Sequence, residues 1–153
     1  MSGVIRPRRP AVIVGTHKGM TNKDPYDPSM RLGERLLVFA GREKFPDKSK
    51  LETCIAQDVH VNGKVSPVRL AAEARRIATE FAPRDIVCIG RGVADAFGMS
   101  RSTPLFAWWP SWVLGPDRWV MIIPDPRAGI TKDIQTCSQR MREVMDDLWD
   151  DNK

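Results

Sequence analysis

The sequence predicts an α/β fold in which a parallel sheet lies between helices, and three observations carry this prediction. Short apolar runs of strand length recur along the 153-residue chain. Longer segments with apolar residues at helical spacing separate these runs. Gly and Pro mark most of the boundaries. Because strands that alternate with helices typically form βαβ units, the strands are expected to run parallel.

The first forty residues predict an arm, a strand, a long loop and a helix. Residues 1–10 are rich in Arg and Pro, so we expect a flexible or strapping N-terminal arm. The apolar run at 11–14 predicts a buried strand, and the turn-forming residues at 16–29 predict a long loop. Residues 30–39 place apolar side chains at helical spacing, and Gly41 ends that helix.

The middle of the chain predicts a polar segment followed by a capped helix. Residues 42–65 are polar and irregular, with a strand near 53–56. Ser66 and Pro67 mark a helix start, because Ser is a preferred N-cap and Pro fits the first helical position. Apolar residues then recur at helical spacing as far as Phe81.

The last part of the chain predicts two strands and two helices around an aromatic segment. Residues 86–89 form an apolar run of strand length, and residues 90–98 predict a short helix bounded by glycines. Residues 106–112 are aromatic and interrupted by Pro. A last strand is predicted at 119–123, and Thr131 caps a predicted helix over 131–148.

The composition indicates one domain, over residues 11–150, without a membrane segment, a metal site or a cofactor. A hydrophobic content of 42% is ordinary for a globular domain. No apolar run approaches the roughly 20 residues that cross a bilayer, and the N-terminus lacks a signal-peptide core. We therefore expect a cytoplasmic protein. The three cysteines and two histidines show no metal-ligand spacing.

The charge balance favours a polyanionic partner. The formal net charge is +5 and the sequence pI is about 9.4. A solvated surface of mixed charge is the alternative, and composition leaves both open. Trp108, Trp109 and Trp112 are near cationic residues in the sequence, which suits base stacking, although an aromatic corner of the core would use the same residues.

Ionisable side chains follow the first and the last predicted strands directly. His17 and Lys18 come after the first strand, and Asp125 and Arg127 come after the last. The carboxyl ends of parallel strands share one edge of the sheet, where ligands bind, so these side chains are expected to meet around one substrate. A histidine there can act as acid or base, and the prolines on both sides of Asp125 would hold its carboxylate rigidly.

A third turn, Gly90-Arg91-Gly92, follows the strand at 86–89. Such a turn could hold a phosphate at a helix N-terminus, or it could be a plain strand-to-helix turn. The sequence contains neither a GxxxxGK[ST] loop nor a GxGxxG motif after the first strand. The common nucleotide-binding folds are therefore disfavoured.

Taken in order, these motifs resemble the uracil-DNA glycosylase superfamily over most of the chain. GTHKG at 15–19 looks like its first motif, a strand end and short turn that carry the water-activating side chain. RLGERLL within 30–39 looks like the helix that follows in compact members. The stretch at 82–99, which contains IVCIGRGVADAFG, is the closest local match, and IIPDPRAGI at 122–130 looks like the second motif.

The resemblance implies a fold and a reaction. The fold is a three-layer α/β/α sandwich around a central four-stranded parallel sheet. The reaction is the flipping of a nucleotide out of DNA and the hydrolysis of its glycosidic bond, which leaves an abasic site. DNA is then the partner, with no membrane, no cofactor and no obligatory protein partner expected.

The chain departs from the family at the residues that carry the chemistry. His17 stands where relatives carry Asp or Asn, and Thr16 stands where one branch carries Glu. Asp125 and Arg127 stand where the family usually has His and Ser. We expect Asp125 to orient water or stabilise the sugar cation, and His17 to support the leaving base or the water.

Further residues are expected to bind the substrate, and they favour a modified or hypermodified pyrimidine. Tyr26 is a candidate to stack on the base, and the amides of Asn22 and Asn62 are candidates to read its edge. Arg127 or Ile130 would fill the gap left by the flipped base. Such a base occurs in bacteriophage DNA, so an anti-phage role would follow. The complete set of expected binding residues is Gly15, Lys18, Gly19, Asn22, Tyr26, Asn62, Arg91, Arg127 and Ile130.

Three alternatives stay open at this point. The altered motifs would also suit a glycosylase-fold module that binds DNA without hydrolysing it. An enzyme that acts on free nucleosides or nucleotides, as a transferase or hydrolase, could use Lys18 and residues 90–92 for a phosphate. A purely structural role is the third, since small domains host many unrelated functions.

Overall fold

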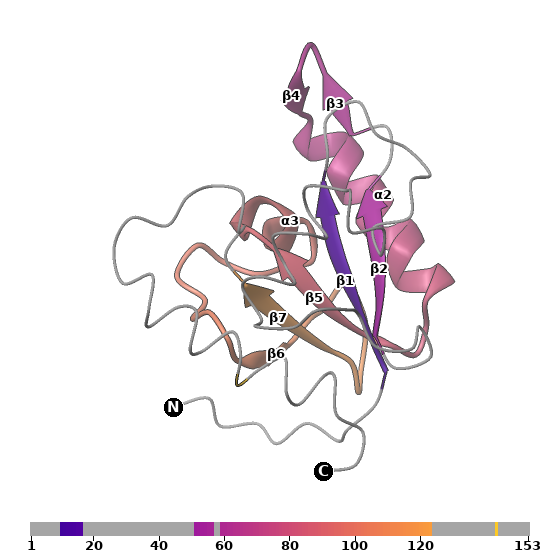
Figure 1. The fold of residues 1–153 in the computed structure, drawn as a ribbon, viewed down its shortest axis with the longest axis vertical. Coiled ribbons are helices and arrows are strands. Elements are labelled where there is room, and N and C mark those ends of the chain that lie inside the picture. The colour runs from indigo at the N-terminus through magenta and orange to yellow at the C-terminus, as the bar shows by residue number, and fades with distance from the viewer. Residues whose placement is uncertain (1–9, 17–50, 57–58, 124–142, 144–153) are drawn as a thin grey trace.

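The computed structural model describes residues 10–16, 51–56, 59–123 and 143 (Figure 1). Five strands form one sheet in the order β2-β1-β5-β7-β6, and two short strands form a separate hairpin. The elements are β1 (Ala11–Thr16), β2 (Leu51–Ala56), β3 (His60–Val61), β4 (Lys64–Val65), α2 (Pro67–Glu80), β5 (Asp85–Ile89), α3 (Arg91–Ala96), β6 (Trp108–Pro110) and β7 (Trp119–Ile123).

The sheet confirms the α/β class and the parallel arrangement. Strands β2, β1, β5 and β7 all run parallel to their neighbours. They coincide with the four predicted strands, each of which the prediction placed within four residues of its observed ends. The fifth strand, β6, runs antiparallel to β7 at the edge of the sheet and was not predicted. It ends at Pro110, and an edge strand tolerates proline because one side of its backbone has no partner strand.

Helices α2 and α3 pack together on one face of the sheet. Their buried side chains join alternate residues of β1, β5 and β7 in one apolar cluster, which includes Val12, Cys88 and Ile122. The intervening strand residues, such as Val87 and Met121, point to the opposite face and are buried as well. Burial on both faces explains why these strands appear in the sequence as continuous apolar runs rather than as alternating patterns.

The outer layer of the predicted sandwich falls outside the described residues. The helices predicted at 30–39 and 131–148, and the arm at 1–10 apart from Pro10, lie there. In the described part of the chain, no helix is both long and apolar enough to span a membrane. The structure therefore gives the parallel sheet and one of the two predicted helical layers, and the other layer stays a prediction.

Helix α2 begins where the sequence predicted, for the predicted reason. Ser66 is its N-cap, and the Ser66 hydroxyl accepts a hydrogen bond of 3.4 Å from the backbone N–H of Arg69. Pro67 occupies the first helical position, where no intrahelical N–H partner is lost. The helix ends at Glu80, and Phe81 is its C-cap.

Cys88 is expected to resist alkylation until the protein unfolds. Its side chain is fully buried in β5, and burial raises the pKa of the Cys88 thiol, so the reactive thiolate is scarce. Differential labelling with iodoacetamide, read by peptide mass spectrometry, should leave Cys88 unmodified in native buffer and modified in urea. The half-buried Cys54 is the internal comparison. Rapid native labelling of Cys88 would contradict the packing of the sheet.

Candidate active site

The strand order places a topological switch point between β1 and β5. From β1 the chain goes first to β2 on one side, and then through α2 to β5 on the other side (Figure 1). In open parallel sheets, ligands bind in the crevice beyond the carboxyl ends of the strands at such a point. By this rule, the candidate ligand crevice is expected beyond Thr16 and Ile89, the last residues of β1 and β5.

The two strand ends that carry the predicted motifs lie on either side of β5. Val14 of β1 pairs with Cys88, and Cys88 pairs with Ile122 of β7. The backbone N–H of Gly90 donates to the carbonyl of Ile123 at 2.8 Å, which holds β5 and β7 together at their carboxyl ends. Since neighbouring strands are about 4.8 Å apart, β1 and β7 end about 10 Å from each other.

Most of the predicted site residues lie outside the described residues. Gly15 and Thr16 form the end of β1, as the first motif requires, and Thr16 is half-buried there. The residues whose places are not described are His17, Lys18, Gly19, Asn22, Tyr26, Asp125, Arg127 and Ile130. The structure thus brings the carboxyl ends of the two motif-bearing strands to one edge of the sheet. The roles of the residues that follow these ends stay predictions.

Arg91 lies at this edge but is held by a structural contact. Gly90 has a φ of +88°, a conformation that suits glycine, and it turns the chain from β5 into α3. Arg91 is the first helical residue, is exposed, and donates from Nη1 to the carbonyl of Thr103 at 2.8 Å. The glycine turn therefore performs the structural role that the sequence left open, and a contact of Arg91 with a phosphate stays a prediction.

Asn62 lies in a β-hairpin, which corrects the prediction of irregular structure up to residue 65. Asn62 and Gly63 both have positive φ values, 53° and 79°, as a type I′ hairpin turn requires. The hairpin β3–β4 projects beyond the carboxyl ends of β1 and β2 (Figure 1). The Asn-Gly pair between valines was the sequence signal for this turn. Asn62 shapes the tip of the hairpin, and its role in reading the edge of a base stays a prediction.

The three clustered tryptophans do not share one environment. Trp108 and Trp109 are half-buried in β6, and Trp109 packs against the apolar cluster, as the core interpretation predicted. Trp112 is 73% exposed, as the stacking interpretation predicted. The core interpretation therefore applies to Trp109, while base stacking on the exposed Trp112 stays a prediction.

The described residues contain no group of three or more His, Cys, Asp or Glu side chains that could hold a metal ion. No protein-family model matches the sequence, and no curated protein matches it either.

Proposed function

We propose that the protein is a DNA glycosylase that flips out a modified or hypermodified pyrimidine and hydrolyses its glycosidic bond, leaving an abasic site. One observation carries the proposal: the sheet order sets the ends of β1 and β7 on either side of β5, beside the switch point between β1 and β5. The two stretches that resemble glycosylase motifs include those strand ends. A parallel sheet with this order offers a crevice where both motifs would act on one nucleotide.

The residues at these strand ends have the chemistry that the reaction needs. When water adds to C1′ of the sugar, the bond to the base breaks and positive charge develops on the sugar. In this mechanism the carboxylate of Asp125 orients the water and accepts its proton, or stabilises the developing cation. The imidazole of His17 would support the departing base, which carries away the bonding electrons. Each of the two residues that depart from the family motifs, His17 and Asp125, thus has a role that its side chain can perform.

The net charge of +5 and the hairpin support DNA as the partner. A cationic protein attracts the phosphate backbone before any base is recognised. The β3–β4 hairpin lies beside the carboxyl edge of the sheet (Figure 1). Three of its side chains are exposed: Val61, Lys64 and Val65. A cation and two exposed apolar side chains on a projecting hairpin suit contact with a duplex that must be opened.

An abasic-site assay tests the proposal. Purified protein is incubated with normal DNA, uracil-containing DNA and bacteriophage DNA that carries hydroxymethylated or glucosylated pyrimidines. The products are treated with alkali and resolved on a denaturing gel. We expect cleavage of one modified DNA only, which would name the base and support a role against phage DNA.

The same assay separates the alternatives. A His17→Ala variant serves as the negative control and should yield little or no cleavage. Binding of DNA without cleavage of any substrate would reject the glycosylase and favour a binding module. Base release from a free nucleotide but not from DNA would favour the nucleotide-modifying alternative.

A further inference from the structure

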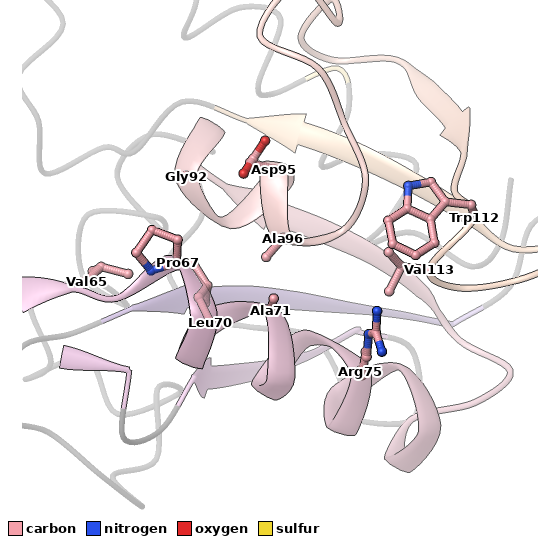
Figure 2. Close-up of a pocket in the computed structure, with 10 residues that line it drawn as sticks. All are labelled: Val65, Pro67, Leu70, Ala71, Arg75, Gly92, Asp95, Ala96, Trp112 and Val113. Atoms are coloured by element: carbon pink, nitrogen blue, oxygen red, sulfur yellow. The ribbon is translucent and has the colours of Figure 1, made fainter. Parts of the chain in front are cut away.

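A groove runs along the helical face of the protein, from the β3–β4 hairpin and the start of α3 toward Trp112. It has a volume of about 320 Å³ and lies between α2, α3 and the turn at 111–114 (Figure 2). Small residues at Ala71, Gly92 and Ala96 leave the space between the two helices open. No sequence pattern predicts this groove, because it depends on how α2 and α3 pack against each other.

Trp112 borders this groove as a fixed and exposed aromatic side chain. The buried Ser111 hydroxyl donates to the carbonyl of Phe97 at 2.6 Å and accepts from the N–H groups of Val113 and Leu114. The indole also packs directly on Gly98, where an added Cβ would lie 2.6 Å from the Trp112 Nε1 atom. The turn is thus held in place while 73% of Trp112 remains exposed. Trp is enriched among the residues that dominate binding energy, and a rigidly held side chain loses little conformational entropy on binding.

Arg75 faces Trp112 from the opposite side of the groove. Figure 2 shows its guanidinium pointing from α2 toward Val113 and Trp112. Among the described residues, the Arg75 side chain has no hydrogen-bond or ion-pair partner. The neighbouring Arg76 is paired instead with Glu73, at 2.6 Å, and with Glu80, and these contacts raise the pKa of Arg76. Among the described residues, Arg75 therefore lies at the groove without a partner, whereas the charge of the adjacent Arg76 is paired.

The groove continues past Trp112 as a second hollow of about 620 Å³. This hollow shares Arg75, Trp112 and Val113 with the first and extends along the last turns of α2. The aromatic ring and the cation therefore stand in the middle of an extended, open depression rather than in a closed pocket. Such a shape suits a polymer that passes through it better than a compact small molecule, and the net charge of +5 favours a polyanion.

We propose that this groove binds single-stranded DNA, with one base stacked on Trp112 and the adjacent phosphate on the Arg75 guanidinium. Stacking requires a base whose face is unpaired, which favours a single strand over a duplex. The carboxylate of Asp95, which also lines the groove, can accept a hydrogen bond from a base amino group. The choice of DNA rests on the proposed function, whereas the stacking and the charge do not. The strand bound here would be a segment away from the excised base.

Fluorescence anisotropy with a labelled twelve-nucleotide oligothymidylate tests this proposal. Replacing Trp112 by Ala should weaken binding about 5- to 150-fold, the range for loss of one stacked base, and Trp112→Phe should retain most of the affinity. Replacing Arg75 by Ala should lower the salt dependence of binding by the contribution of about one phosphate. Arg76→Ala is the matched control. It also removes one positive charge, from the adjacent position, but the Arg76 side chain is already paired with Glu73 and Glu80.

Circular dichroism first establishes that each variant is folded. Equal affinity of Trp112→Ala and the unaltered protein would overturn the proposal, as would an equal change of the salt slope in Arg75→Ala and Arg76→Ala. Tighter binding of the duplex, or binding of oligouridylate without oligothymidylate, would also overturn it. The Asp125→Asn variant distinguishes this result from the excision reaction. If the protein excises no base but binds oligothymidylate through Trp112, the groove proposal stands and only the proposed function is rejected.

Discussion

The Asp125→Asn variant is expected to excise its base about 10²–10⁴-fold more slowly than the unaltered protein, while its affinity for DNA remains the same. The amide keeps the size and shape of the side chain but can neither accept a proton from water nor offset positive charge on the sugar. Contacts to the phosphate backbone do not involve this carboxylate, so binding should persist. Single-turnover kinetics on the cleaved substrate measure the loss, and anisotropy measures the affinity.

Asp117→Asn provides the matched control for this experiment. Asp117 is exposed in the turn that precedes β7, so it lies before the amino end of the strand whose carboxyl end leads to residue 125. Its φ of 62° is one that Asn adopts readily. The same chemical change should therefore leave both fold and excision intact there. Full activity of Asp125→Asn would remove this carboxylate from the mechanism and leave His17 as the remaining candidate to activate water.

Local sequence signals predicted the elements that depend on local chemistry. Ser66 and Pro67 start α2 because a side-chain cap and a fixed φ act within one turn of helix. The strands β5 and β7 could be predicted because both of their faces are buried in the parallel sheet, so their sequences are unbroken apolar runs. The edge strand β6 was missed because half-buried tryptophans and a terminal proline resemble a loop as much as a strand.

The arrangement of the site could be predicted only in part, because strand order is a long-range property. No residue of β1 shows by itself that β2 lies on one side and β5 on the other. The expectation that the strand ends share an edge followed from parallel topology, and the observed order is consistent with it. Arg75 gave no signal at all, since only its surroundings distinguish it from Arg76 in the same helix.

Replacing Arg118 by Ala is expected to lower the free energy of unfolding by about 3 kcal/mol. The Arg118 side chain is buried and donates from Nη1 to the carbonyl of Ala78 at 2.7 Å. Its Nε and Nη2 atoms both donate to the carbonyl of Arg84, at 2.9 and 2.7 Å. The first of these carbonyls belongs to the last turn of α2, where the helix itself supplies no donor. Removing the guanidinium leaves both acceptors without this donor and opens a gap in the packing.

Urea denaturation measures this loss, and a thermal scan should show a midpoint lower by about 6–12 °C for a chain of this size. Arg101→Ala, at an exposed turn position, is the control and should stay within about 0.5 kcal/mol of the unaltered protein. A loss for Arg118→Ala no larger than that of the control would mean that these hydrogen bonds do not hold α2 to β7. Arg118 precedes the amino end of β7, whereas the proposed chemistry lies beyond its carboxyl end. The folded fraction of Arg118→Ala should therefore excise at the unaltered rate, which separates a residue that maintains the sheet from one that acts on the substrate.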